Sequence, residues 1–386
     1  MKMKNQKLII LFGAVLMQIS IGAIYSWTLF NEALHNKFNW DISDILLTNS
    51  LIIFVFAFTT MFSGRLLDRF GSRIIGTIGG ILYGLGLILT SRADTLIELY
   101  LFYGVIAGIG VGFVYVCPLA TCIKWFPKKK GLVTGIAIGA FGMGSLIFKT
   151  VIEALIINKG VSQSFLWLGM IYLILTVTGS RLLKEPSKSH SDKHKENNST
   201  LYTVRTMVKT KNFYFIWFSY LLACIGGLLL ISSAVEVGLN VAHVTFTQAT
   251  SAVIIISIFN TLGRLFWGII SDKIGCRLSA MLMFILSALA LFTISLIPIN
   301  IFLFYFLIAI ITFCFGGFLV IYPTITSEYF GLTNLGRNYG LVYQAYGVAA
   351  LIGPILLKHS NSYTTPFIIT GITSIIGLIL ISQIRK

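Results

Sequence analysis

The sequence predicts an all-α membrane protein with twelve transmembrane helices arranged as two six-helix repeats. Only 11% of its 386 residues are charged and 56% are hydrophobic, whereas about 25% of the residues of a soluble domain are charged. Twelve apolar runs follow one another along the chain, and each reaches the roughly 17 residues that a transmembrane helix needs. A motif in the first half also recurs in the second. Together these observations exclude a water-soluble enzyme, a disordered chain and a nucleic-acid-binding domain.

The apolar runs fall into two groups of six, separated by a polar stretch. They cover residues 8–30, 45–63, 74–91, 96–123, 131–157 and 163–183, and then 212–235, 248–270, 278–298, 301–327, 338–358 and 364–383. The stretch 184–211 holds seven Lys and Arg residues, and its polar composition is typical of a solvated linker. We therefore expect an N-terminal six-helix bundle over 1–183, a cytoplasmic linker over 184–211 and a C-terminal six-helix bundle over 212–386.

The distribution of Lys and Arg predicts the orientation in the membrane. If the N-terminus is cytoplasmic, 23 of these residues fall on the cytoplasmic side and 4 on the opposite side. Positive residues accumulate in cytoplasmic loops, so we expect both termini in the cytoplasm of a multi-pass protein of the plasma (inner) membrane. This placement explains the basic pI of about 9.7 without nucleic acid, and it predicts contact with anionic membrane lipid.

The two halves repeat a loop motif at a constant offset. Gly64-Arg-Leu-Leu-Asp68-Arg69-Phe-Gly71-Ser-Arg73 follows the second apolar run, and Gly268-Ile-Ile-Ser-Asp272-Lys273-Ile-Gly275-Cys-Arg277 follows the eighth, 204 residues later. Pro118 and Pro323 are a second pair of matching positions in the two halves, 205 residues apart. Two parallel repeats with binding at their interface are a known transporter architecture.

At this loop the chain resembles the major facilitator superfamily, and the resemblance covers the whole chain. It implies the major facilitator fold, and secondary active transport by alternating access. It also implies a conformational gate made of the motif residues Gly64, Asp68, Arg69, Gly71 and Arg73 and of Gly268, Asp272, Lys273, Gly275 and Arg277. We expect the Asp68 carboxylate to cap the next helix and to pair with Arg69 or Arg73. The alternative is an ordinary basic loop that obeys the positive-inside rule.

Four shorter motifs are similar to the oxalate/formate antiporter family. They are Ala23-Ile-Tyr25-Ser-Trp-Thr-Leu-Phe, Lys124-Trp-Phe-Pro127, Phe259-Asn260-Thr-Leu-Gly263-Arg264-Leu-Phe-Trp267-Gly268 and Arg337-Asn-Tyr-Gly340. This resemblance implies a small carboxylate held at the midplane between an aromatic cage and two cations, one in helix eight and one in helix eleven.

Arg264 matches the first of these cations. It lies eight residues before Asp272, and therefore about 12 Å inside the cytoplasmic end of its helix. An arginine at that depth is costly unless it faces a cavity or a partner, so a functional role is the default interpretation. Its guanidinium can bind a carboxylate through two charge-assisted hydrogen bonds. The alternative is a structural arginine that pairs with backbone carbonyls.

The second cation is replaced by Tyr346, which predicts a monocarboxylate rather than a dianion such as oxalate. Lys149 is a possible second charge, although it lies near the outer surface with Glu153 one turn away. A lysine paired with that glutamate at the surface is the alternative.

The family's cage positions are all aromatic in this chain. They are Tyr25, Tyr115, Phe141, Phe315 and Tyr343. Together with Arg264 and Tyr346 they form the predicted substrate-binding set. Aromatic residues also simply pack helices together, and 30 Phe and 16 Tyr make coincidental matches easy.

We expect a monomeric transporter of a small carboxylate such as formate, lactate or pyruvate, by antiport or another coupling mode. No cofactor, metal site, catalytic cluster or nucleic-acid partner is indicated, so we expect no enzymatic activity. Two alternatives stay open. One is a proton-coupled exporter of hydrophobic or cationic compounds, which a mid-span acid would favour. The other is a membrane sensor that kept the fold but does not transport.

Overall fold

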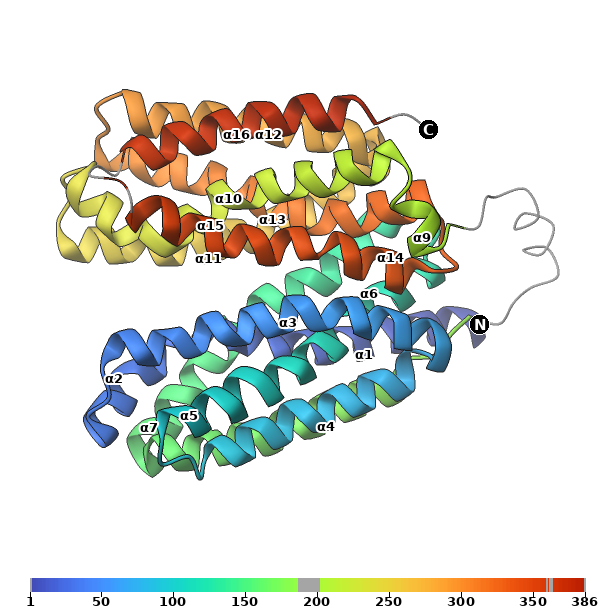
Figure 1. Cartoon of the computed structure of the whole chain (residues 1–386), viewed down its shortest axis with the longest axis horizontal. Helices are drawn as coiled ribbons and strands as arrows, with labels where there is room; N and C mark the ends of the chain where they lie inside the picture. Colours follow the sequence, from blue (N-terminus) through green and yellow to red (C-terminus); the bar gives the residue numbers. More distant parts are fainter. Residues whose placement is uncertain (1, 187–201, 359, 361–363, 385–386) are drawn as a thin grey trace. The chain divides into compact units, whose positions relative to one another are not determined.

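The computed structural model describes residues 2–186, 202–358, 360 and 364–384, and every regular element in these ranges is a helix (Figure 1). Apolar side chains face outward along many of them. On α3 (Ile42–Phe70), for example, Phe54, Phe58 and Phe62 are 39%, 40% and 58% exposed. Residues four apart share one face of a helix, so these rings form a stripe. An exposed apolar stripe of this length is suited to lipid rather than water.

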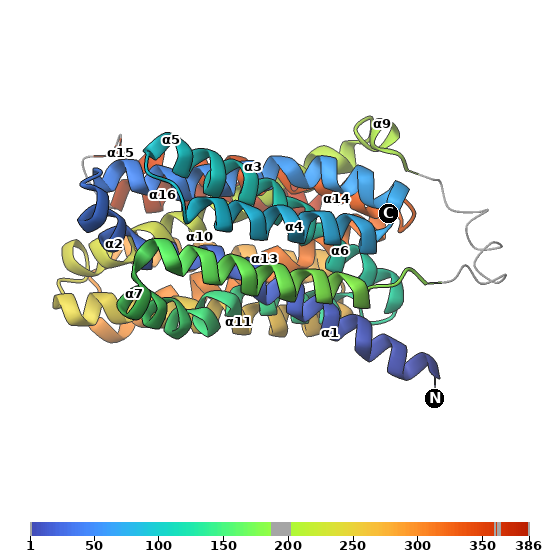
Figure 2. The ribbon, with the colours of Figure 1, turned by 90° about the horizontal axis from the view of Figure 1, so that it is seen from below.

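The first half of the chain contains helices of very different lengths. They are α1 (Lys2–Gly22), a 3-10 turn at Ala23–Ser26, α2 (Thr28–Phe38), α3, α4 (Ser72–Thr90), α5 (Leu96–Leu99), a π-helical segment at Tyr100–Ala107, α6 (Gly108–Trp125) and α7 (Lys130–Leu182). α7 reverses direction at Gly160, whose φ of 78° is left-handed, and its two segments run back along each other (Figure 2). A glycine adopts that φ without the steric cost of a Cβ.

The second half follows the same plan after a short helix, α9 (Val204–Met207). Its long helices are α10 (Lys211–Asn240), α11 (Phe246–Ile274), α12 (Cys276–Leu296), α13 (Ile301–Phe330), the pair α14 (Leu335–Val342) and α15 (Gln344–Lys358), and α16 (Thr364–Ser382). Pro118 lies inside α6 and Pro323 inside α13. The two prolines that match in the sequence therefore occupy corresponding helices.

The predicted fold class is confirmed. Among the described residues, ten helices are long and apolar enough to cross a membrane. One of them, α7, contains two of the predicted runs because of its reversal at Gly160. The predicted run 338–358 is divided between α14 and α15, each of which is shorter than a full crossing. Each of the twelve apolar runs is therefore mainly helical.

The chain divides into two compact units, and each contains a short segment from the other half of the sequence. Unit 1 comprises residues 1–127, 140–203 and 331–341, and unit 2 comprises 128–139, 204–330 and 342–386. The first turns of α7 thus belong to unit 2, and most of α14 belongs to unit 1. The predicted boundaries at 183 and 212 remain a prediction.

Glycines allow these inserted segments to pack closely. In unit 1, a Cβ on Gly64 of α3 would lie 1.9 Å from the carbonyl oxygen of Gly336 in α14. In unit 2, a Cβ on Gly268 of α11 would lie 2.5 Å from the carbonyl oxygen of Gly131 in α7. Both contacts are too tight for any residue larger than glycine, which is how small residues bring membrane helices together.

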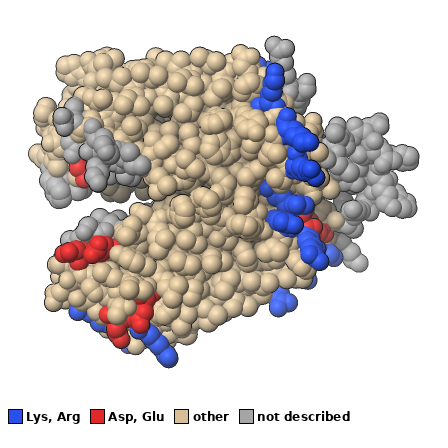
Figure 3. Space-filling view, viewed as in Figure 1, with Lys and Arg blue, Asp and Glu red and all other residues tan. Residues whose placement is uncertain are grey.

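Charge is unevenly distributed along the helices. Figure 3 shows that Lys and Arg gather at one end of each unit, and that Asp and Glu gather at the opposite end of unit 1. Of the predicted linker 184–211, residues 187–201 lie outside the described residues. At its described end, the carbonyl oxygen of Tyr202 accepts hydrogen bonds from the side-chain amides of Asn334 (3.0 Å) and Asn338 (3.1 Å), all within unit 1.

Candidate functional site

Arg264 is buried in unit 2, with 2% of its surface exposed. It lies on α11, ten residues before the helix ends at Ile274. Its Nε donates to the Oδ1 of Asn260 at 2.9 Å, and its Nη1 donates to the carbonyl oxygen of Ile138 in α7. The backbone-carbonyl contact is the one that the structural alternative predicted. A guanidinium that binds a substrate carboxylate would also need to be buried and held in place, so these contacts fit both interpretations of Arg264.

Three of the predicted cage residues come together in unit 1. Tyr25 and Tyr115 both contact the ring of Phe141 edge-on, with ring centroids 5.3 Å and 5.5 Å apart. They come from the 3-10 turn, from α6 and from α7, so the cluster joins three separate segments of the chain. Phe56 of α3 completes it, 5.1 Å from Tyr115. We call these four residues the unit 1 aromatic cluster.

Unit 2 contains a cluster of tyrosines. Tyr343 stacks on Tyr346 with ring centroids 5.2 Å apart, and Tyr220 of α10 lies 6.4 Å from Tyr343. Tyr220 also stacks on Tyr322 of α13 at 4.1 Å, and the Tyr322 hydroxyl donates to Ser219. We call Tyr220, Tyr322, Tyr343 and Tyr346 the unit 2 tyrosine cluster. All four are almost completely buried.

Phe315 and Lys149 lie in other surroundings. Phe315 is buried on α13 and packs on α10, where a Cβ on Gly227 would lie 2.4 Å from its ring. The Nζ of Lys149 lies 3.8 Å from a carboxylate oxygen of Glu153, and the two side chains are 57% and 45% exposed. The Lys149 side chain therefore takes the surface pairing that the sequence offered as the alternative to a second substrate charge.

Two predicted binding residues lie where a helix is interrupted. Tyr25 is on the 3-10 turn between α1 and α2, and Tyr343 lies between α14 and α15. At both breaks the backbone hydrogen bonds span three residues: Trp27 N donates to the Ile24 carbonyl, and Tyr346 N donates to the Tyr343 carbonyl. Broken helices at membrane depth are tolerated where they are buried in protein or line a cavity, and substrate sites of transporters are built on them.

Asp68, in the first of the two loop motifs predicted to form a gate, makes a different contact from the expected one. Its carboxylate accepts a hydrogen bond from the backbone N–H of Arg337 (3.1 Å), at the start of α14, instead of capping the next helix. Asp272 acts in the same way on α7, accepting from the N–H groups of Gly131 and Leu132, both at 2.9 Å. In each unit a motif carboxylate thus stabilises the positive end of the inserted helix. The expectation for Asp68 was wrong because the partner helix is distant in sequence.

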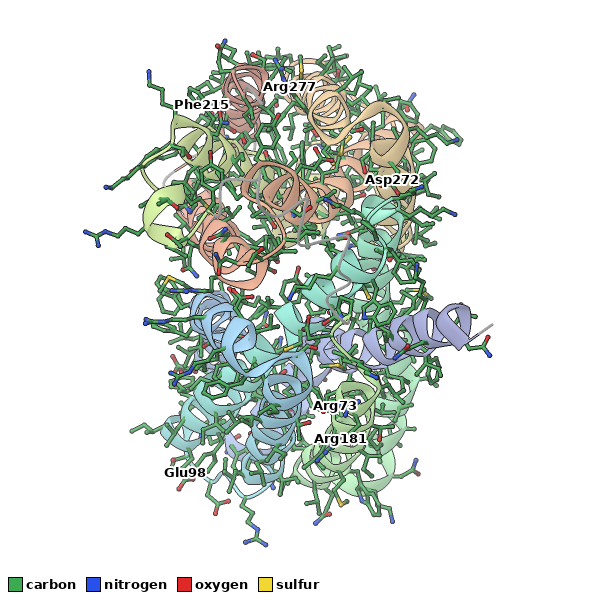
Figure 4. The ribbon with its side chains drawn as sticks, turned by 90° about the vertical axis from the view of Figure 1, so that its right-hand side faces the viewer. Arg73, Glu98, Arg181, Phe215, Asp272 and Arg277 are labelled. Atoms are coloured by element: carbon green, nitrogen blue, oxygen red, sulfur yellow. The ribbon has the colours of Figure 1, made fainter. Side chains whose placement is uncertain are left out.

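The other motif residues form two matching sets. Gly71 and Gly275 directly precede α4 and α12 with φ of 83° and 87°, a conformation that favours glycine. Arg73 donates to the carbonyl of Leu183 and Arg277 to that of Ser382, so both join the start of one helix to the end of another. Figure 4 looks onto the helix ends that carry Arg73, Asp272 and Arg277. Arg69 lies over the ring of Phe70, and Lys273 is exposed.

Several residues of this site were not identified from the sequence. Asn260 lies four residues before Arg264, a spacing at which helix side chains pair, so this contact could have been found. Phe56, Tyr220 and Tyr322 carry no local signal, because their roles depend on which helices pack together. Among the described residues there is no group of three or more His, Cys, Asp or Glu side chains that could hold a metal.

A model of the Major Facilitator Superfamily matches residues 8–259, and matches again over residues 216–384. The chain belongs to the major facilitator superfamily. This membership accounts for the two repeats, for the multi-pass membrane architecture and for the repeated loop motif. The chain is therefore a transporter of this superfamily by its family and its curated relatives.

Curated relatives of this major facilitator protein include carboxylate transporters. It is 34% identical over 344 residues to an uncharacterized MFS-type transporter of Escherichia coli, YhjX, covering 88% of this chain and 85% of that one. It is 29% identical over 381 residues to the oxalate:formate antiporter of Oxalobacter formigenes, covering 97% and 90%. It is 27% identical to monocarboxylate transporter 12 of Mus musculus, covering 80% and 70%.

Solved structures show the same fold. A double-tryptophan mutant of XylE superposes with a TM-score of 0.78 at 14% identity, covering 99% of this chain and 95% of that one. At this identity the likeness shows the major facilitator fold alone.

Proposed function

We propose that the protein transports a small monocarboxylate across the plasma membrane by alternating access. The observation that carries the proposal is the buried, doubly anchored guanidinium of Arg264 on α11. An arginine inside a membrane helix marks a substrate pathway by default, and guanidinium is the side chain that best matches a carboxylate. The relatives named for oxalate, formate and monocarboxylates support the substrate class.

The aromatic residues are assigned as the walls of the binding site. In unit 2, which contains Arg264, we assign Phe315 and the tyrosines Tyr343 and Tyr346. In unit 1, Tyr25, Tyr115 and Phe141 of the aromatic cluster stay predicted substrate-binding residues. The helix breaks at Tyr25 and Tyr343 support this role, since such breaks position substrate groups in transporters. An apolar wall excludes water and thereby strengthens the interaction between the carboxylate and Arg264.

The preference for a single carboxylate follows from charge. Arg264 supplies one positive charge, and Tyr346 is neutral where the related family has its second cation. A second carboxylate facing Tyr346 would have hydrogen bonds only, and a buried charge without compensation is strongly disfavoured. Formate, acetate, lactate and pyruvate are therefore the expected substrates, and oxalate is not.

Counterflow in proteoliposomes tests this function. Purified protein is reconstituted with each unlabelled anion inside, and uptake of labelled formate, acetate, lactate, pyruvate and oxalate is measured. We expect counterflow of at least one monocarboxylate and its loss in Arg264→Gln. Each charge-assisted hydrogen bond to the guanidinium contributes about 1.5–3 kcal/mol, so affinity falls roughly tenfold or more for each one lost.

Arg264→Lys separates charge from shape. It should also lose most of its activity, because an ammonium cannot reproduce the two parallel bonds of the guanidinium. Size-exclusion profiles and melting temperatures establish that both variants fold. Normal counterflow by Arg264→Gln would show that the site is wrongly assigned. Anion binding without counterflow would instead indicate a sensor built on this fold.

A further inference from the structure

The Arg264 guanidinium is held at two of its edges inside unit 2. On one edge, Nε donates to Oδ1 of Asn260, one helical turn earlier on α11, at 2.9 Å. On another, Nη1 donates to the carbonyl of Ile138 on α7. A planar group held at two edges can neither rotate nor translate without breaking a hydrogen bond. Since Nε is a donor, the atom of Asn260 that faces it is the amide oxygen.

Asn260 is itself restrained by α13. A Cβ on Gly316 would lie 2.1 Å from the backbone oxygen of Asn260 and 3.1 Å from its Oδ1. The α13 backbone can approach this closely only because residue 316 is glycine. The same crossing is tight at Gly263, where a Cβ would lie 2.0 Å from the carbonyl oxygen of Phe313. The close contact between α11 and α13 therefore restrains the Asn260 side-chain amide that binds Arg264.

The chemistry of an amide suits this position. An asparagine accepts a hydrogen bond from the guanidinium but carries no charge, so it fixes the direction of Arg264 without neutralising it. An aspartate of the same shape would accept the same hydrogen bond and would also offer its own negative charge to the guanidinium. That internal ion pair would compete with a substrate carboxylate for the same positive charge.

We infer that Asn260 is a positioning residue for Arg264: it aims the guanidinium at the substrate while leaving its charge for the anion. This inference rests on the proposed function for the role of Arg264. Asn260 acts through Arg264 and is itself no substrate ligand. If Asn260 is a neutral positioning group, removing its oxygen acceptor and replacing it by a charged carboxylate should both weaken anion binding, but to different extents.

Kinetic measurements on two Asn260 variants test this difference, with labelled formate and lactate as probes. Asn260→Ala removes the acceptor and should raise KM roughly tenfold, as expected for one hydrogen bond to a charged group. Asn260→Asp keeps the acceptor and the shape but should raise KM further at neutral pH. Both variants should raise KM while changing the maximal rate little, because the lost acceptor and the added charge act on binding of the anion.

Ser257→Ala provides the matched control. Ser257 lies one turn before Asn260 on α11 and bonds to the Val253 carbonyl of its own helix, so this variant should keep the wild-type KM. Asn260→Ser, which retains an oxygen acceptor on a shorter side chain, replaces Asn260→Ala if that variant does not fold. Equal increases of KM in Asn260→Ala and Asn260→Asp would overturn the inference, because a neutral positioning group predicts a larger increase when a charge is added. Wild-type KM in both variants would overturn it as well.

A double-mutant cycle tests the contact between Asn260 and Arg264 independently of the proposed transport function. Melting temperatures are measured for Asn260→Ala, Arg264→Gln and the double variant. Residues in direct contact give non-additive effects, so the double variant should lose clearly less than the sum of the two single losses. Additive losses would overturn the inference whatever the protein transports. If the losses are non-additive but Arg264→Gln transports normally, the proposed function fails and the Asn260–Arg264 contact stands.

Discussion

At the scale of single residues, surroundings rather than charge distinguish Arg264 from Lys149, two cations that lie inside apolar runs rather than at their ends. Arg264 is 2% exposed and is held by α7 and by its own helix. Lys149 has more than half of its side chain exposed and lies beside the exposed Glu153. An exposed pair of this kind contributes about 0–1 kcal/mol, because water and salt screen it. A buried guanidinium, in contrast, interacts strongly with any anion that reaches it.

Substitutions of Tyr346 test whether the binding site has one positive charge or two. Tyr346→Lys should shift preference from monocarboxylates toward oxalate by roughly tenfold or more, because a lysine there adds a second cation for the second carboxylate. Tyr346→Phe is the control, since it keeps the ring that stacks on Tyr343 and should keep the monocarboxylate preference. Competition of unlabelled anions against labelled formate uptake measures the shift.

Lys149 offers a rival source of the second charge. If wild-type protein takes up oxalate in preference to every monocarboxylate, and Lys149→Ala removes that preference, then Lys149 supplies the charge and the monocarboxylate assignment is wrong. If Lys149→Ala leaves the order of preference unchanged, the lysine is a surface residue.

At the scale of elements, helix interruptions and glycine contacts determine where side chains can meet. The breaks at Tyr25 and Tyr343 turn single apolar runs into pairs of shorter helices. The glycines of α7 at 131, 135 and 139 follow one face of the helix, one turn apart, and this face lies against α11. The tightest of these contacts is at Gly131, whose backbone N–H also donates to the Asp272 carboxylate.

Two alanine substitutions on that face should differ in their effect. In Gly131→Ala the new methyl group would lie 2.2 Å from the Gly268 carbonyl oxygen, so we expect a loss of about 1–3 kcal/mol in stability from overpacking. In Gly139→Ala its nearest neighbour would be Leu265 at 3.6 Å, an ordinary contact, and the change should stay within about 0.5 kcal/mol. Thermal unfolding in detergent measures both. Equal melting temperatures would contradict the tight contact at Gly131.

At the scale of the whole molecule, the uneven distribution of Lys and Arg and the repeated loop motif both fit a membrane protein built from two repeats. Most of the Lys and Arg residues visible in Figure 3 lie at one end of each unit, a distribution of the kind that the positive-inside rule describes. The repeated aspartates, Asp68 and Asp272, each bind the start of a helix that comes from the other half of the sequence. Contact with anionic lipid and a monomeric state remain predictions.

The orientation can be measured with single cysteines in a background from which the five native cysteines have been removed. Ser191→Cys, in the predicted cytoplasmic linker, should not react with an impermeant thiol reagent in intact cells. Asn36→Cys, at an exposed position of α2, should react. Reaction at position 191 in intact cells would show that the predicted orientation is wrong.

Much of the architecture could be predicted because it depends on local sequence. Low charge and long apolar runs determine that the chain must form membrane helices, since a backbone in lipid has to satisfy its hydrogen bonds within each segment. The constant offset of 204 between the motifs determines the two repeats. Of the candidate site, Arg264 stands out by its depth in an apolar run, because a charge at that depth is costly.

What only the tertiary structure decided are the contacts between residues far apart in the chain. The sequence determined that Asp68 would bind a helix start, but only packing showed that this start is Arg337, 269 residues away, rather than the next helix. Packing alone also brought Phe56 to Tyr115 and the Ile138 carbonyl to Arg264. The physical reason is that helix formation depends on neighbours within about four residues, whereas the choice of partner helix depends on how whole faces, and the glycines in them, fit together.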